Sequence, residues 1–186
     1  MSKLNLRAAF SQINLNTSQK KFLRNSAIAL VGWFFLADAV PIHNFFTDIL
    51  TQSSQKTIQF LSEKSPFTMP VIQFNGKLQT HLWDDRGHIM ISFMCNGWDL
   101  YYLCIAFIAV FPGYTLKRKL IFSAIGFIAL FGSNVLRIVG LFYIHKIRPE
   151  WFDLFHHTIF QGWVYIVMFI IWIIYLRQKK EILPKE

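Results

Sequence analysis

The chain has 186 residues, of which 54% are hydrophobic, and its formal net charge is +9 at pH 7. Its 20 Phe and 6 Trp residues, together with a positive mean hydropathy, are unusual for a soluble domain. Apolar runs of about 20 residues recur, and each is long enough to cross the hydrocarbon core of a bilayer. Composition therefore argues against an ordinary soluble domain and predicts an integral membrane protein.

The first 24 residues are polar and carry five basic side chains. We predict that residues 1–24 form a cytoplasmic arm whose scattered apolar residues let it lie on the membrane surface. The first span is predicted over residues 25–46, with Pro41 kinking it near its outer end and Asp38 facing a neighbouring helix or water. No cleavage site of small residues follows this apolar run, so we expect no secretory signal peptide.

Residues 47–94 form the only sizeable segment predicted outside the membrane. Asn75-Gly76 indicates a hairpin turn, and the runs on either side of it are typical of strands. The expected elements, in chain order, are a helix over 57–63, breaks at Ser65-Pro66 and Met69-Pro70, strands over 71–74 and 77–83, a turn over 84–87 and a third strand over 88–94. This β-meander leads the chain directly to Cys95.

Three further apolar segments follow, over residues 97–111, 120–143 and 157–176. We therefore predict an all-α membrane protein with about four transmembrane helices in a bundle. A small extracytoplasmic β-containing insertion precedes the second helix. Residues 95–176 form a three-span core in this scheme, and residues 177–186 form a basic cytoplasmic tail.

The distribution of charge predicts the orientation. With both termini and the loop over 113–119 on the cytoplasmic side, that side holds 12 of the 19 Lys and Arg residues and only two acidic residues. The outer segments hold six basic and six acidic residues. Cytoplasmic loops of membrane proteins carry an excess of Lys and Arg, so the basic charge reports topology and requires no nucleic acid. We expect a multi-pass protein of the cytoplasmic membrane.

Cys95 directly precedes the second predicted span. Asn96 is predicted to be the N-cap of that helix, with Asp99 completing a weak capping box. The helix dipole then favours a thiolate at Cys95, and the N–H groups of Gly97 and Trp98 can bind an oxyanion. The charge of Asp99 opposes this effect, and the alternative is an inert, partly buried cysteine.

The other cysteine and most of the histidines have simpler interpretations. Cys104 lies nine residues beyond Cys95, roughly 13 Å along one helix and too far for a disulfide, so we expect it to pack in the bundle. His145, His156 and His157 could hold a metal, but adjacent histidines on a helix point about 100° apart. We expect no metal and no other cofactor. The histidines expected to be solvated or interfacial are His43, His81, His88 and His145.

Arg137 lies inside the third predicted span, where an arginine costs several kcal/mol unless it faces protein or water. It shares one helical face with small residues, at the spacing that packs against other helices. The face consists of Gly126, Ala129, Ser133, Arg137 and Gly140, with Asn134 on a neighbouring edge. Arg137 is therefore expected to face the bundle.

Cys95, Arg137 and His157 are predicted to lie at one depth. They lie 17, 17 and 19 residues from the cytoplasmic ends of their predicted spans, which corresponds to roughly 26 to 28 Å of helical rise. A thiol and an imidazole are the minimum for a nucleophile with a general base. A guanidinium beside them can bind an oxyanion or a carboxylate. The pattern predicts acyl transfer through a thioester at the outer edge of the membrane.

These segments resemble the exosortase/archaeosortase family of multi-span membrane cysteine transpeptidases. The resemblance covers roughly residues 88–176 and rests on Cys95-Asn96-Gly97, on Asn134-Val135-Leu136-Arg137, and on His156-His157 followed by Gly162-Trp163. Asn96 stands where the family usually has Ser, and the chain has only about four spans where larger relatives carry more.

The resemblance implies that Cys95 is the nucleophile, His157 the general base and acid, and Arg137 the stabiliser of substrate or oxyanion. Asn96, Gly97, Trp98 and Asn134 would support the site. It also implies protein substrates with a C-terminal signal made of a short motif, an apolar helix and a basic tail. Their cleaved ends would pass to a glycan or lipid acceptor at the extracytoplasmic face, or to water.

Two alternatives stay open. His156 competes with His157 for the role of base, and His157 is preferred because Gln161 and Gly162 would bring its face inward one turn later. The second function class is a non-enzymatic membrane assembly or transport subunit, in which Arg137 supplies a functional buried charge. A non-enzymatic subunit needs no thiol, so the effect of removing the Cys95 thiol distinguishes the two hypotheses.

Overall fold

The computed structural model describes residues 16–62, 65–73, 75–85 and 87–178. Their elements, in chain order, are α2 (Thr17–Leu36), α3 (Val40–Ser62), β1 (Phe67–Ile72), β2 (Leu78–Trp83), β3 (His88–Ile91), η1 (Phe93–Cys95), α4 (Trp98–Val110), α5 (Leu116–Ile147), η2 (Pro149–Trp151), α6 (Phe152–Leu154), η3 (Phe155–Ile159) and α7 (Phe160–Arg177). The predicted arm over 1–24 is described only from residue 16 onward, and most of the predicted tail over 177–186 lies outside the described residues.

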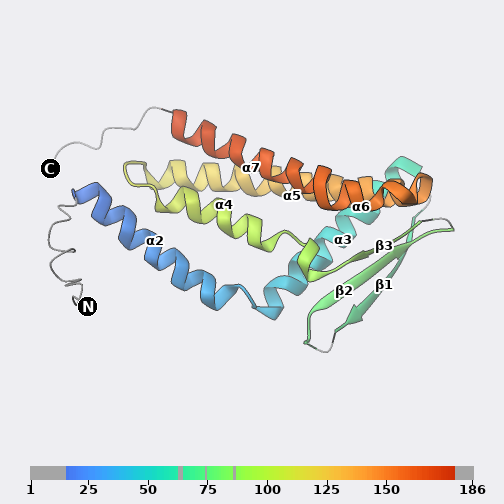
Figure 1. Cartoon of the computed structure of the whole chain (residues 1–186). Helices are drawn as coiled ribbons and strands as arrows, with labels where there is room; N and C mark the ends of the chain where they lie inside the picture. The colour runs from blue at the N-terminus through green and yellow to red at the C-terminus, as the bar shows by residue number, and fades with distance from the viewer. Residues whose placement is uncertain (1–15, 63–64, 74, 86, 179–186) are drawn as a thin grey trace, which may run out of the picture.

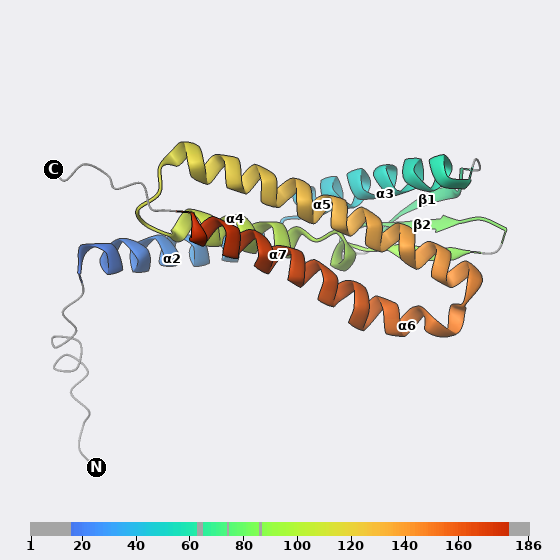
Figure 2. The same cartoon turned by 90° about the horizontal axis from the view of Figure 1, so that it is seen from above.

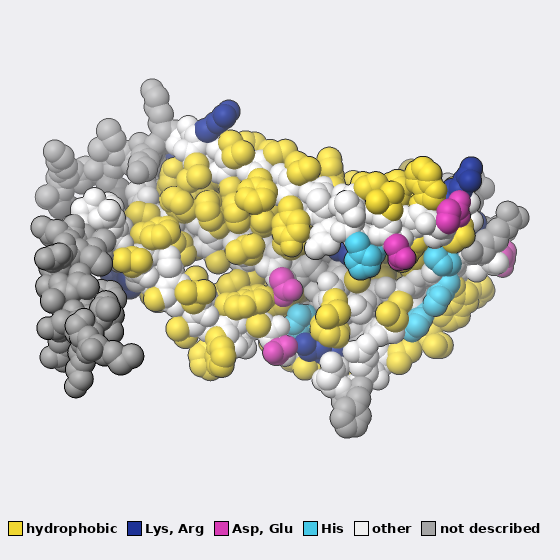
Figure 3. All heavy atoms as spheres, in the orientation of Figure 1, with side chains coloured by type: hydrophobic (Ala, Val, Ile, Leu, Met, Phe, Trp, Pro, Cys, Tyr) yellow, Lys and Arg dark blue, Asp and Glu magenta, His cyan; other side chains and the backbone are white. Residues whose placement is uncertain are grey.

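The helices form an elongated bundle with a small sheet at one end. Helices α4, α5 and α7 pack on one another, and α2 packs on α4. The start of α2 and the end of α7 lie at the end of the bundle opposite the sheet and α3 (Figures 1 and 2). Hydrophobic side chains cover the helical end, whereas histidine and acidic side chains gather towards the sheet (Figure 3).

Three segments are long and apolar enough to cross a membrane: 93–110, 116–147 and 149–177. A fourth crossing is available if the bent pair α2 and α3 counts as one span. The described part of the chain is thus largely helical, with three to four candidate spans, which is compatible with the predicted all-α membrane protein. Arg137 lies roughly 32 Å along α5 from Leu116, so a bilayer that begins at Leu116 ends near Arg137.

The predicted first span over 25–46 is not one helix. The chain breaks between Leu36 and Val40, and the two helices meet at 81°. The bend lies just before Pro41, so the predicted kink is a full break, and Pro41 itself lies in the first turn of α3, where a missing N–H costs little. The helix predicted over 57–63 is the end of α3, which runs unbroken to Ser62.

The predicted β-meander is confirmed as an antiparallel sheet with strand order β1-β2-β3. Gly76 has φ of 76° in the turn between β1 and β2, a conformation that glycine adopts without strain. Pro70 does not break the chain but lies inside β1, which is an edge strand and tolerates a missing N–H. Strand β3 ends at Ile91, so the chain turns into η1 before it reaches Cys95.

Two clusters of buried residues hold these layers together. The first joins α4, α5 and α7 around Tyr101, Leu130 and Met168. The second joins the sheet to α3 and to the second half of α5. Its members are Leu50, Ile58, Leu82, Ile89, Ile91, Ile138, Val139 and Phe142. Helix α5 contributes residues to both clusters, so it connects the sheet to the helical bundle.

The start of α4 differs from the prediction. Its N-cap is Gly97, with φ of 76° and ψ of 8°, and not Asn96. Gly97 also approaches α5 so closely that a Cβ built on it would lie 2.8 Å from Asn134 Nδ2. Asp99 is exposed in the first turn and forms no capping box with Asn96, whose side chain instead bonds to Trp98 N and to α3.

We predict that Gly97→Ala lowers the free energy of unfolding by about 2 kcal/mol or more, because alanine is strained at a left-handed φ and its Cβ meets Asn134. Gly132→Ala is the matched control. Gly132 is exposed in α5, a Cβ there meets nothing within 4 Å, and alanine favours the helix by about 1 kcal/mol. Thermal unfolding of both variants in detergent should shift in opposite directions, and equal shifts would contradict the assignment.

Candidate functional site

Cys95 is the last residue of η1, between the end of the sheet and the start of α4. Its N–H donates to the carbonyl of Ser92 at 2.9 Å, and its Sγ lies 3.9 Å from Ser92 Oγ. The side chain is half-buried and packs against the cluster that joins the sheet to α5. Cys95 is therefore held in place by its backbone, while its thiol keeps partial access to solvent.

Asn96 anchors this turn to α3. Only 1% of its surface is exposed. Its Nδ2 donates to His43 Nδ1 at 3.2 Å, to the His43 carbonyl at 3.1 Å and to Thr47 Oγ1 at 3.3 Å. Its Oδ1 accepts from Trp98 N–H at 3.0 Å. One carboxamide thus satisfies polar groups of both α3 and α4.

His43 is buried, so the prediction of a solvated or interfacial His43 is wrong. Its Nε2 lies 2.7 Å from the Ala37 carbonyl, to which it can only donate, so its Nδ1 is free to accept from Asn96. His43, Thr47 and Thr51 are all buried and recur every four residues along α3. Polar residues that share one helical face at a spacing of four are the signal that sequence reasoning missed.

One turn of α5 connects the three predicted elements. Asn134 Nδ2 donates to the Cys95 carbonyl at 3.0 Å. Arg137, three residues further along α5, has its Nη2 3.2 Å from His156 Nε2. The two residues are separated by about 4.5 Å of helical rise, so Cys95 and His156 are both tied to neighbouring positions of the same helix.

The contacts of Arg137 define the protonation of the histidine pair. A guanidinium has only donors, so His156 Nε2 accepts from it. His156 Nδ1 then carries the hydrogen and donates to His157 Nε2, 3.2 Å away. Arg137 Nε is buried and has no hydrogen-bond partner among the described residues. A guanidinium N–H thus remains available to an anion.

His156, the alternative base, contacts Arg137, whereas the preferred His157 is exposed and reaches Arg137 only through His156. Both histidines lie in η3, a π-helical turn, and not at the start of a regular helix as predicted. Among the described residues, no hydrogen bond joins Cys95 Sγ to either histidine. Asn134 and Arg137 thus attach the Cys95 turn and His156 to α5, without an aligned proton transfer from the thiol. Catalytic hydrogen bonds are often long in an unliganded site.

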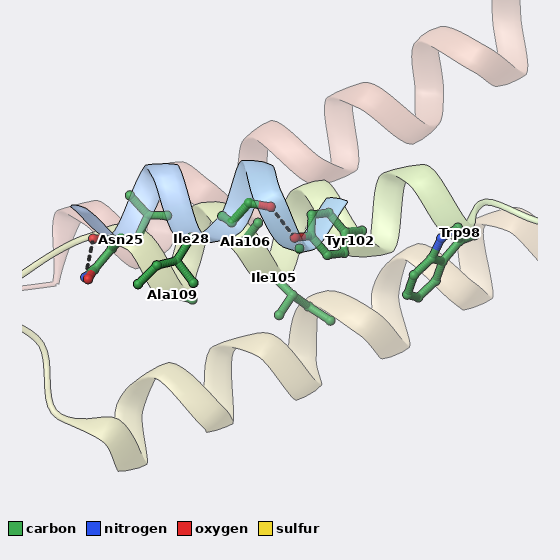
Figure 4. A pocket seen from close by; sticks show the side chains of 10 residues that line it. Asn25, Ile28, Trp98, Tyr102, Ile105, Ala106 and Ala109 are labelled. Atoms are coloured by element: carbon green, nitrogen blue, oxygen red, sulfur yellow. Dashed lines mark hydrogen bonds between the residues drawn. The ribbon is translucent and has the colours of Figure 1, made fainter. Parts of the chain in front are cut away.

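Trp98 connects the site to the outside of the bundle. Its Nε1 donates to the Leu36 carbonyl at 3.1 Å, which ties the end of α2 to the start of α4. It also lines an apolar groove of about 650 Å³ between these helices. The groove runs from Asn25 to Trp98, and Tyr102 crosses it to bond with the Ala29 carbonyl (Figure 4). Cys104 lies away from this groove and is fully buried in the bundle, as expected.

Within the described ranges, no group of three or more His, Cys, Asp and Glu side chains is arranged to hold a metal ion. The described chain is a helical bundle with three to four candidate membrane spans, in which Asn134 bonds to the Cys95 carbonyl and Arg137 to His156 at the sheet end. No model of a known protein family matches the chain, and comparisons with curated proteins and with solved structures find no match.

Asn96→Ala is expected to lower the free energy of unfolding by about 3 kcal/mol, because it leaves polar groups of His43 and Thr47 buried without their partner. The control is Asn25→Ala, which removes one contact of 3.4 Å to the Val110 carbonyl and should cost below about 1 kcal/mol. Chemical denaturation in detergent measures both. Similar losses for the two variants would show that Asn96 is not an anchor.

Proposed function

We propose that the protein is a membrane cysteine peptidase or transpeptidase of the exosortase type. The observation that supports this best is the turn of α5 on which Asn134 holds the Cys95 carbonyl and Arg137 holds His156. A thiol, a guanidinium and an imidazole are the groups that acyl transfer through a thioester requires. The Cys95 carbonyl and His156 are each bonded to α5, at positions three residues apart, which supports the proposal.

In the proposed reaction, Cys95 Sγ loses its proton to a histidine and attacks the carbonyl carbon of a peptide bond. The carbon–nitrogen bond breaks, and the leaving amine takes the proton back from the histidine. The acyl group remains on Sγ as a thioester. A hydroxyl or amine of an acceptor, or water, then attacks the thioester and returns the thiol.

Arg137 serves the oxyanion or a substrate carboxylate in this scheme. Its Nε is buried without a partner in the described part of the chain, and leaving such a donor unsatisfied costs about 1 to 3 kcal/mol. An anionic oxygen at this position would remove that cost and would be bound by a charge-assisted hydrogen bond. His156 is our choice of base, because it is the histidine in contact with Arg137.

The substrates that the resemblance implies are exported proteins ending in a short motif, an apolar helix and a basic tail. The acceptor would be a glycan or a lipid, and the site would face the extracytoplasmic side of the cytoplasmic membrane. A site near the outer end of the candidate spans suits a scissile bond that precedes a membrane-embedded helix. The basic tail would then lie on the cytoplasmic side, in line with the predicted orientation.

Cys95→Ala should abolish processing, because no other group in the proposed site can form the thioester. C-terminal proteomics of cells that carry the variant should show at least tenfold accumulation of precursors that keep an apolar helix and a basic tail. Cys104→Ala is the matched control. It removes a buried thiol of the bundle core and should leave processing unchanged if the protein is present at normal levels.

Unchanged precursor levels in Cys95→Ala cells, with the variant folded and in the membrane, would exclude the enzyme. That result would favour the non-enzymatic subunit, which needs the charge of Arg137 but no thiol. Loss of processing in both cysteine variants would point instead to a structural requirement in the bundle.

The two histidines should differ in a pulse-chase measurement of precursor conversion. His156→Ala removes the proposed base and should slow conversion by at least about 100-fold. His157→Ala removes only the partner of His156 Nδ1 and should slow it by less than about 10-fold. The reverse order would assign the base to His157, and two small effects would refute a histidine base altogether.

A further inference from the structure

The outer face of the sheet carries a row of soft donor side chains. Met69 of β1 is directly opposite His81 of β2, and His81 is directly opposite Met90 of β3. Opposed residues of antiparallel strands project from the same face, with Cβ atoms about 4.5 to 5.5 Å apart. The other face of the sheet is the buried one, with Leu82, Ile89 and Ile91 in the core. The row Met69–His81–Met90 is therefore on the open face.

Two potential metal ligands of this row, His81 and Met90, already contact the same hydrogen-bond donor, the side-chain amide of Gln79. The amide nitrogen of Gln79 contacts Met90 Sδ and lies 3.1 Å from His81 Nε2. An amide nitrogen offers only hydrogens, so a thioether lone pair and an imidazole lone pair both point at the same spot. Met69 is paired in register with the histidine that lies between the two methionines. A small cation could take the place of the amide group.

The second nitrogen of His81 is also arranged as in a metal-binding histidine. Because His81 Nε2 accepts from Gln79, Nδ1 carries the hydrogen and donates to His88 Nε2 at 3.0 Å. A histidine that binds a metal almost always donates its other N–H to a carboxylate, a carbonyl or water, which fixes the ring, and here a second imidazole is the acceptor. The rings of His81 and His88 are stacked within 6° of parallel, and histidine side chains form a continuous patch at this end of the molecule (Figure 3).

We propose that this face binds one Cu(I) ion through Met69, His81 and Met90, with His88 orienting His81. Thioethers and imidazoles are soft ligands that select Cu(I) over harder cations. All three ligands are neutral and no carboxylate belongs to the row, so a monovalent cation is better matched than a divalent one. The site is separate from the proposed cysteine site and does not depend on it.

The test uses the full-length Cys95→Ala variant in detergent, labelled with ¹³C at its methionine methyls and titrated with Ag(I), a soft monovalent cation that is not reduced or oxidised in the assay. The Met69 and Met90 resonances should shift together and saturate at one equivalent. Met94, which is 79% exposed, and Met168, which is 2% exposed, report adventitious binding and unfolding and should not move. Zn(II) should leave all these methyl resonances in place.

Met69→Leu keeps the side-chain volume and should weaken Ag(I) binding at Met90 by at least tenfold, as should His88→Ala through the orientation of His81. Met94→Leu is the matched control and should leave the affinity unchanged. Equal shifts at Met94, a response to Zn(II) at the same methyls, or full affinity in Met69→Leu would each overturn the proposal.

Discussion

The position of Cys95 depends on the buried carboxamide of Asn96. Its two ends bond in opposite directions, to His43 and Thr47 on α3 and to the N–H of Trp98 on α4. A serine, which the resemblance would place here, has one short hydroxyl and could not span the same gap. The Asn96 side chain therefore links two helices and does not act as the N-cap of α4. Gly97 is the N-cap, with a backbone conformation that glycine adopts freely.

Helix α5 sets the spacing of the remaining groups. At 32 residues it is longer than a bilayer requires, and its second half packs on the sheet and α3 while its first half packs in the bundle. Asn134 and Arg137 lie where these two halves meet. Because both side chains project from one rigid element, the Cys95 turn and the histidine pair have a fixed relation although they are about 60 residues apart in sequence.

The sequence predicts those parts whose cause is local. Long apolar runs predict α4, α5 and α7, and Asn75-Gly76 predicts the hairpin. Each signal lies within the element that it predicts. The break at 37–39 lies just before Pro41, so its position has a local signal, but its angle of 81° does not. It is held by tertiary contacts, namely His43 with the Ala37 carbonyl and Lys77 with Asp38 at 3.0 Å. The burial of His43 likewise depends on Asn96, 53 residues away, and the π-turn that presents His156 has no simple sequence signal.

The pairing of Arg137 with His156 has a consequence for the proposed chemistry. In the structure the guanidinium occupies the one lone pair with which neutral His156 could accept a proton. A substrate oxygen, carbonyl or carboxylate, near the unpartnered Nε would compete for the same guanidinium and draw it away from the imidazole. Substrate binding would then free His156 Nε2 before any proton is transferred. A site of this kind would remain inactive towards its own thiol until a substrate oxygen engages Arg137.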